Sequence, residues 1–211
     1  MYRPAAFDEP DVGRLHRLID DIAIAILVSA GADGLEASHL PVLLDAGAGP
    51  HGTILGHLAR ANPHWRRLDG GEVLLVLQGP NGYVSPNWYP TKQETGMVVP
   101  TWNYVAVHVT GEARTFDDRD SLRDLVTRLT ERHERRFAAP WSVADAPAGF
   151  VDRMLGQIVG VAVRVRRLEG KLKLSQNRPP EDRQGVVAGL DATGDAGDAL
   201  LAAAMRRLSE I

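Results

Sequence analysis

Short apolar segments recur along the chain and predict a protein built mainly from β-strands. Residues 22–29 (IAIAILVS) are apolar and rich in β-branched side chains, and residues 36–45 and 53–58 follow after glycine-containing turns. The connections between these three segments are too short for a crossover helix, so we expect the strands to pair as antiparallel neighbours. Residues 72–78 (EVLLVLQ) predict a fourth strand of the same continuous apolar kind.

Strict alternation marks two later segments. Residues 104–110 place a valine at every second position, and residues 158–168 repeat that pattern with arginines on the outer face. A turn at residues 169–170 is expected to end the second segment, and residues 171–175 (KLKLS) to form one more strand. Six or seven strands, most of them adjacent in sequence, favour a mainly β (α+β) fold: an antiparallel β-barrel with peripheral helices.

Helical periodicity appears between and after the strands. The predicted helices cover residues 10–20, 63–68, 121–136, 143–156, 180–189 and 198–208. Asp120 or Ser121 is expected to cap the third of these, which has leucines at helical spacing. Gly189 is expected to end the fifth. A doubly wound α/β fold is disfavoured, because the first half lacks strand–helix alternation and no glycine-rich phosphate motif follows a strand.

Aromatic residues and prolines gather between Gly79 and Gly111. Because a proline removes an N–H donor and holds the preceding residue extended, this stretch predicts a long, rigid loop that leads into the strand at residue 104. An aromatic loop of this kind suits the wall of a site for a flat ligand. It also suits a plug for the end of a barrel, and the composition does not separate the two.

Composition sets the outer limits. The 211 residues, 44% of them hydrophobic, suffice for one domain or for one domain with an appendage. The net charge of −3 gives no general reason to expect nucleic acid. The absence of cysteine excludes disulfides, thiolate metal sites and cysteine nucleophiles. No apolar run is long enough for a bilayer and residues 1–20 do not resemble a secretory leader, so a cytoplasmic location is expected.

One candidate binding segment is residues 56–65 (GHLARANPHW). Arg60 follows a strand and precedes a helix start at Asn62-Pro63. Free backbone N–H groups, the helix dipole and a guanidinium together suit a phosphate, and His57 is near enough in sequence to join them. The alternative is a surface arginine beside an ordinary capped helix.

Two further segments carry polar side chains of interest. Ser38 and His39 are neighbours on a strand and point to opposite faces, so they do not form a catalytic dyad. Lys171 and Lys173 share one face of a predicted strand, with amide side chains following at residues 176–177. That run suits an anionic ligand, although two lysines on one face are also typical of a solvated surface. No histidine pair has zinc-binding spacing, so no metal site is expected, and no catalytic residue is predicted.

Four segments resemble the PaiB-like proteins, a family of FMN-binding negative transcriptional regulators. They are residues 1–7 (MYRPAAF), 57–63 (HLARANP), 79–104, with GPNGYVSPNWY and VPTWNY at its ends, and 171–177 (KLKLSQN). The resemblance implies a split β-barrel, as in pyridoxamine-phosphate oxidases and flavin reductases. It further implies a homodimer with FMN at the subunit interface. We expect residues 1–170 to form the FMN-binding domain, and residues 171–211 a C-terminal extension packed on the barrel.

The resemblance also implies which barrel residues bind FMN. Arg60 would hold the phosphate, with His57 and Asn62 close by. The isoalloxazine ring would run along the strand that contains Ser38 and His39.

Other residues are implied near the ring. Trp102 and Asn103 of the second chain would cover it. Lys171, Lys173 and Gln176 would lie at the rim or form an effector site.

The activity is less determined than the cofactor. One hypothesis is a flavin-binding regulatory dimer that acts on DNA directly or through a regulatory protein. Another is an FMN-dependent oxidoreductase resembling flavin reductases. A third is haem binding in a split barrel, with His39, His57 or His108 as the axial ligand. No basic recognition helix is evident, and acidic residues interrupt the densest run of arginines, at residues 132–136.

Overall fold

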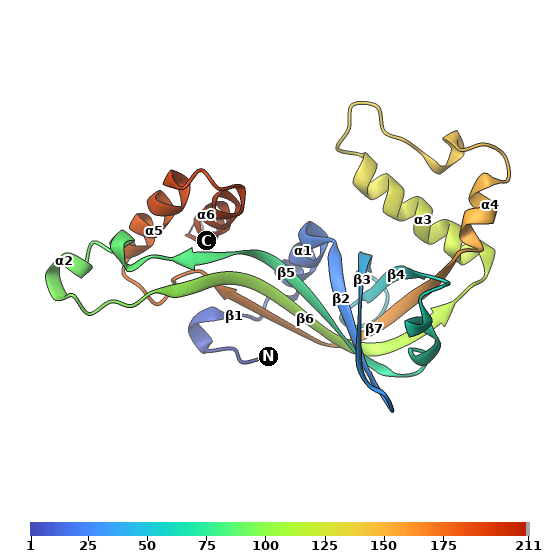
Figure 1. The fold of residues 1–211 in the computed structure, drawn as a ribbon, viewed down its shortest axis with the longest axis horizontal. Helices are drawn as coiled ribbons and strands as arrows, with labels where there is room; N and C mark the ends of the chain where they lie inside the picture. The colour runs from blue at the N-terminus through green and yellow to red at the C-terminus, as the bar shows by residue number, and fades with distance from the viewer. Residues whose placement is uncertain (210–211) are drawn as a thin grey trace. The chain divides into compact units, whose positions relative to one another are not determined.

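The computed structural model describes residues 1–209 and is organised around one antiparallel sheet (Figure 1). The strand order is β1-β7-β4-β3-β2-β5-β6, and an additional pairing of β7 with β6 closes six of the strands into a ring. The strands are β1 (Asp8–Glu9), β2 (Ile24–Gly31), β3 (Gly34–Asp45), β4 (Thr53–Ala59), β5 (Glu72–Val84), β6 (Thr101–Phe116) and β7 (Ile158–Lys173). The expected barrel of antiparallel strands with peripheral helices is therefore confirmed.

The predicted pairing of the first three long strands is also confirmed. β2 and β3 form an antiparallel hairpin in which Gly31 pairs with Gly34, and β3 continues into β4 with Val42 opposite Gly56. The turn needs Gly34, whose φ of 101° is a conformation that side chains with a Cβ rarely adopt. Burial alternates along each strand, so every second side chain lies in the barrel core.

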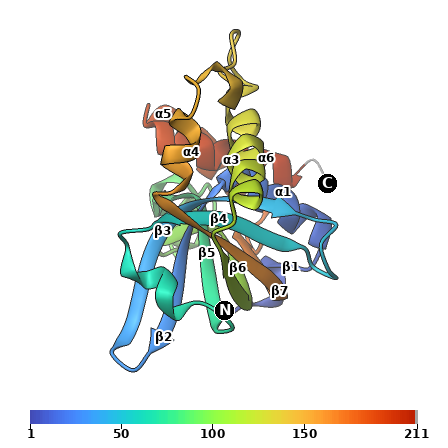
Figure 2. The same ribbon diagram turned by 90° about the vertical axis from the view of Figure 1, so that its right-hand side faces the viewer.

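Helices occur before, between and after these strands along the chain. They are η1 (Ala5–Phe7), α1 (Val12–Ile22), η2 (Pro63–Arg67), η3 (Pro86–Trp88), α2 (Lys92–Thr95), α3 (Arg119–Glu134), η4 (Val143–Asp145), α4 (Phe150–Leu155), α5 (Pro180–Ala192) and α6 (Ala196–Ser209). Figure 2 shows α3 beside α4. α3 buries Leu125 and Leu129 against Leu43 of β3. Its cap is Asp118, whose carboxylate accepts from the Ser121 N–H at 2.9 Å, and not Asp120 or Ser121 as expected. None of the described helices has the length and apolar character needed to cross a membrane.

Two strands are longer than predicted. β7 does not turn at Glu169 but continues to Lys173, because β1 pairs with its far end, with Asp8 opposite Lys171. β5 likewise extends to Val84, so the first part of the predicted aromatic loop is strand. In both cases pairing with a distant segment satisfies backbone groups that a turn would otherwise have satisfied.

Two predicted helices also differ. α5 passes through Gly189 and ends at Ala192. A Cβ on Gly189 would lie 2.3 Å from the Trp88 ring, so this glycine permits close packing and does not terminate the helix. The predicted helix over residues 143–156 consists of two short pieces, η4 and α4, separated by Gly149 with a φ of 70°.

The chain forms two compact units, each described by itself below. The first contains residues 12–77 and 108–168, and the second contains residues 1–11, 78–107 and the described residues from 169 onward. The first unit holds α1, α3 and α4 with most of the barrel strands, and the second holds α2, α5 and α6. The division into residues 1–170 and 171–211 stays a prediction.

Candidate functional site

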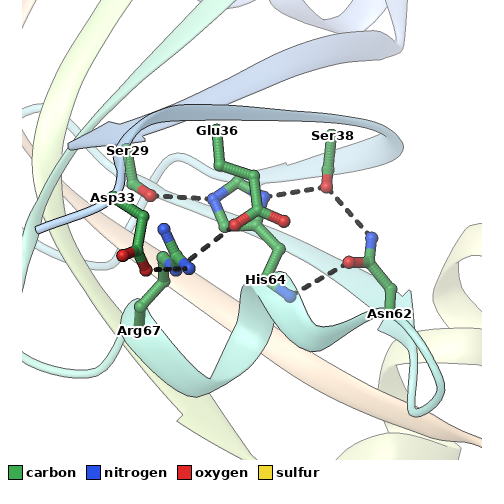
Figure 3. Close-up of polar contacts among 7 residues, drawn as sticks. All are labelled: Ser29, Asp33, Glu36, Ser38, Asn62, His64 and Arg67. Carbon is green, nitrogen blue, oxygen red and sulfur yellow. Dashed lines mark hydrogen bonds and ion pairs between the residues drawn. The ribbon is translucent and has the colours of Figure 1, made fainter. Parts of the chain in front are cut away.

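A buried histidine lies at the centre of the polar cluster in the first unit (Figure 3). His64 belongs to η2, which begins directly after Asn62, and the Asn62 side-chain oxygen accepts from the His64 N–H at 3.0 Å. The His64 ring is inaccessible to solvent. Its Nε2 lies 2.8 Å from Ser29 Oγ on β2, and its Nδ1 lies 2.8 Å from Ser38 Oγ on β3. Asn62 also donates to Ser38 Oγ, at 3.0 Å.

The cluster is satisfied as a neutral unit. A neutral imidazole has one N–H donor and one acceptor nitrogen, so one serine accepts from the ring and the other donates to it. Burial lowers the pKa of His64, and the charge of Arg67 lowers it further, while that of Glu36 opposes the shift. A neutral, inaccessible ring with both nitrogens bonded is a positioning element that joins η2 to two strands, and it is not placed to exchange protons with a substrate.

Arg67 closes the outer side of this cluster. Its Nε lies 3.2 Å from Glu36 and one terminal nitrogen lies 3.5 Å from Asp33. Figure 3 shows the Glu36 carboxylate and the Arg67 guanidinium beside the imidazole. These ion pairs are partly exposed, so they contribute little stability individually, but they leave Arg67 committed to protein carboxylates.

Arg60, the expected phosphate ligand, is engaged mainly with backbone. Its Nε donates to the Gly156 carbonyl at 3.0 Å, and Nη2 donates to the Ile158 carbonyl at 3.1 Å. Nη1 lies 3.4 Å from an Asp117 oxygen. The guanidinium therefore ties the end of β4 to the start of β7. A phosphate at this corner would have to approach Nη1 and compete with the Asp117 carboxylate.

His57 and His39 lie apart from the Ser38 cluster in their contacts. His57 lines a cavity of about 350 Å³ whose other members include Pro41, Leu129 and Trp141. Its Nδ1 is buried and has no hydrogen-bond partner among the described residues, and burial lowers its pKa. His39 is exposed, on the opposite side of β3 from Ser38, as strand alternation predicts.

The second unit presents an aromatic surface at the start of β6. Trp102 is 51% exposed and Tyr83 is 49% exposed. Their rings meet edge to face, with centroids 6.4 Å apart and planes at 63°. The Trp102 indole N–H donates to the Asn81 side chain at 3.2 Å, which fixes the orientation of the indole. Two large aromatic side chains are therefore half-exposed beside each other in this unit.

Asn103 and Lys173 lie in the same unit and carry unused hydrogen-bonding capacity. Asn103 is buried; its amide nitrogen donates to Ser175 Oγ at 2.9 Å, while its oxygen has no partner among the described residues. The Lys173 ammonium donates to the Trp102 carbonyl at 2.6 Å and to Thr101 Oγ1. An ammonium has three N–H groups, so one remains. Burial lowers the pKa of Lys173, and the nearby charge of Lys171 adds to the shift.

Two other residues of the KLKLSQN segment are held internally. Lys171 is only 7% exposed, and its ammonium lies 5.3 Å from the Tyr2 ring centroid and 5.2 Å from that of Tyr104. Gln176 folds back on the strand end: its oxygen accepts from the Leu174 N–H at 2.7 Å and its nitrogen donates to the Leu172 carbonyl. Gln176 therefore closes the end of β7 with its side-chain amide.

Residues 1–167 match the family model described as "Putative FMN-binding domain". The chain belongs to the PaiB-like FMN-binding family. The relatives of this family include the protease synthase and sporulation protein PAI 2 of Bacillus subtilis, 31% identical over 188 residues, which cover 89% of this chain and 87% of the relative. They also include an uncharacterized protein of Emericella nidulans, 34% identical over 234 residues and 93% of each chain. FMN is the cofactor of the family.

Solved structures agree on the fold at low sequence identity. The flavocytochrome Anf3 from Azotobacter vinelandii matches with a TM-score of 0.60 and 10% identity, over 87% of this chain and 78% of that one. The FAD and heme binding protein from Mycobacterium smegmatis matches with a TM-score of 0.60 and 16% identity, over 89% and 80% of the two chains. The family thus has the split β-barrel that the sequence motifs implied.

Sequence reasoning did not single out His64 or Ser29. A usable signal was present, because Ser29 and Ser38 occupy inward positions of two apolar strands, in line with Leu27 and Leu40. A hydroxyl at such a position needs a buried partner. The first polar side chain after the Asn62-Pro63 corner supplies that partner for both serines.

Proposed function

We propose that the protein is an FMN-binding homodimer that regulates transcription, acting through a partner protein. The family membership supports flavin binding, and the relative PAI 2 carries a name that refers to protease synthesis and sporulation. Direct binding to DNA is less well supported than action through a partner, because the arginines near the end of α3 are not all available. Arg132 donates to the Asp20 side chain at 2.8 Å and is 11% exposed, so it is not available to a phosphate backbone.

The flavin proposal rests on the side chains at the start of β6 and the end of β7, in the second unit. Trp102 offers an exposed aromatic face and Lys173 an unused N–H group. Asn103 follows Trp102 directly on the strand, so its buried oxygen lies on the opposite face of β6 and Asn103 stays only a predicted ligand. An isoalloxazine ring has two flat faces and carbonyl acceptors on its pyrimidine edge, so Trp102 and Lys173 match its chemistry. When bound, FMN would supply redox chemistry, while the protein binds and orients it.

In the first unit the His64 cluster fixes Ser38 and Asn62, which stay predicted ligands of FMN. His57 has a buried ring nitrogen without a partner among the described residues, in a cavity. His39 and Arg60 remain predicted ligands of the ring and of the phosphate. For Arg60 this role requires the Nη1 edge to exchange Asp117 for the phosphate.

Fluorescence titration of FMN with the full chain tests the flavin proposal. Trp102→Ala is expected to weaken FMN binding by about five- to a hundredfold, since stacking on an aromatic side chain is worth roughly 1–3 kcal/mol. Phe150→Ala is the matched control, because Phe150 is similarly exposed, at 44%, on a helix of the other unit. Equal FMN affinity in wild type, variant and control would remove Trp102 from the site.

Dimerisation is proposed because the second unit exposes several large apolar side chains close together in sequence. Met97 is 81% exposed and Val99 is 65% exposed, next to Trp102. A second copy would cover this surface in the manner that the family resemblance implies. Sedimentation as a monomer at micromolar concentration, with FMN present, would contradict this part of the proposal.

An FMN-dependent oxidoreductase is the second candidate. The half-exposed Trp102–Tyr83 surface favours it, because a ring bound there would stay open to a substrate on one face. Steady oxidation of NADH or NADPH by the FMN-loaded protein, lost in Trp102→Ala, would support the enzyme. Two results together would support the regulator. The protein would show no turnover, and a deletion strain would have altered transcript levels that return to normal with the wild-type gene but not with Trp102→Ala. A Soret band in the purified protein would instead indicate haem.

A further inference from the structure

The two C-terminal helices line a partly open cavity, and no barrel residue is among its described lining residues. It has a volume of about 460 Å³, within the roughly 300–1,000 Å³ of sites that hold small molecules. α5 and α6 pack against one another, as Figure 1 shows. The apolar lining comes from both helices and from the residue after β7: Leu174, Val187, Ala188, Met205 and Leu208.

One cation in this lining has no acceptor. Arg183 lines the cavity, its Nε is buried without a hydrogen-bond partner, and its guanidinium makes no ion pair within residues 1–209. Arg206, on the other helix, is different, because Asp191 neutralises it through a salt bridge. The described lining residues therefore carry an excess of one positive charge, and a buried N–H without an acceptor is costly.

The opposite side of α5 is firmly attached within the same unit. Asp182 is fully buried and accepts from the Thr91 N–H at 3.2 Å and from the Thr91 hydroxyl at 2.8 Å. A Cβ on Gly185 would lie 2.0 Å from the Trp88 carbonyl oxygen, so the helix backbone sits directly on this segment. α5 is thus held from behind, and the side that bears Arg183 is free to receive a ligand.

We propose that this cavity binds an amphipathic organic anion: a medium-sized apolar body that carries a single carboxylate. The carboxylate would accept hydrogen bonds from Arg183, and the apolar body would cover Val187 and Met205. Because Asp191 already pairs with Arg206, Arg183 is the one guanidinium of the described lining without an ion pair. One such guanidinium suits a monoanion better than a phosphate dianion, which needs more donors. None of the residues proposed to hold FMN is among the described lining residues of this cavity, so the ligand is proposed to be distinct from FMN.

Displacement of anilinonaphthalene sulfonate by decanoate tests the proposal on the full chain saturated with FMN. Both probes combine an apolar body with one anionic group, and the naphthalene fluoresces when it leaves water. Wild type is expected to bind the dye and to release it to decanoate. Arg183→Gln should weaken decanoate binding about ten- to a hundredfold, as for the loss of a charge-assisted hydrogen bond. Ala188→Trp should abolish it, because the indole would fill the cavity.

Arg207→Gln is the matched control, since Arg207 is an exposed arginine of α6 outside the cavity lining. It should bind decanoate like wild type, and circular dichroism should show unchanged helix content in all three variants. Equal decanoate affinity in wild type and Arg183→Gln would overturn the proposal, as would dye binding that Ala188→Trp leaves intact. If FMN added to the FMN-free protein displaced the dye, the cavity would be a flavin site and the separate-ligand proposal would be wrong.

Discussion

Ser38 gives the sharpest test of the buried cluster, because its hydroxyl serves two partners at once. In wild type Ser38 Oγ lies 2.8 Å from His64 Nδ1 and accepts from Asn62 at 3.0 Å. Ser38→Ala removes one oxygen atom and adds no bulk. His64 Nδ1 then has no partner, in a side chain that water does not reach, and Asn62 loses one hydrogen bond at the edge of the cluster.

The expected magnitude follows from these two losses. A buried polar group left without a partner costs about 1–3 kcal/mol, and an ordinary hydrogen bond contributes about 0.5–1.5 kcal/mol. Because Asn62 is only half-buried and finds water, its share lies at the low end. The free energy of unfolding should therefore fall by about 1.5–3.5 kcal/mol. For a chain of this size that lowers the melting temperature by roughly 3–14 °C.

Urea denaturation followed by circular dichroism measures the change, with Ser121→Ala as the control. Ser121 is exposed on α3, where its backbone N–H and its hydroxyl both approach the Asp118 carboxylate, so the loss of its hydroxyl should lower stability by less than about 1 kcal/mol. If Ser38→Ala cost no more than Ser121→Ala, the hydroxyl would not be holding the imidazole. The idea that His64 joins η2 to two strands would then be wrong.

Three further outcomes are expected. Burial lowers the pKa of His64 below its usual 6.5, whereas the unfolded chain takes up a proton near that value. The free energy of unfolding should therefore be highest at neutral pH and should fall as the pH drops from about 7 to 5. An imidazole NMR signal that shows a protonated His64 already at pH 6 would contradict this. Arg60→Met should lower the free energy of unfolding by about 1–2 kcal/mol even without FMN, since two backbone carbonyls lose their donor, and unchanged denaturation would refute the structural role. Gly185→Ala should destabilise the protein by about 1–3 kcal/mol, because its Cβ would meet the Trp88 carbonyl at 2.0 Å. Gly197→Ala is the control and should be neutral or stabilising, because only a side-chain oxygen lies near Gly197. Equal melting temperatures for the two variants would exclude the clash.

Much of the fold is predictable because it depends on local patterns. Alternation over residues 158–168 predicts which side of β7 is buried, and Val161 and Val163 are in the core while Arg164 is exposed, as expected. The strand ends were not predictable in the same way. Glu169 and Gly170 look like a turn, yet they stay extended because a segment more than 150 residues earlier pairs with them.

The candidate site divides along the same line. The motifs correctly implied an FMN-binding family. They also singled out Ser38, because it lies on a predicted strand, and Asn62, because it precedes a predicted helix start; the two side chains are hydrogen-bonded to each other. They did not reveal that the Arg60 guanidinium is bonded to carbonyls of Gly156 and Ile158. Nothing near Arg60 in the sequence shows which carbonyls lie within its reach.

The sequence by itself determined the strand periodicity, the family, and the inward positions at which buried hydroxyls need partners. These properties depend on residues close together in sequence, because side-chain direction repeats every two positions in a strand. Only the tertiary structure decided which donors and acceptors are already satisfied: His64 is consumed between two serines, while Asn103 and Arg183 keep buried atoms without partners. Hydrogen bonds between distant segments depend on distances of a few tenths of an ångström, and the order of the residues along the chain does not fix such distances.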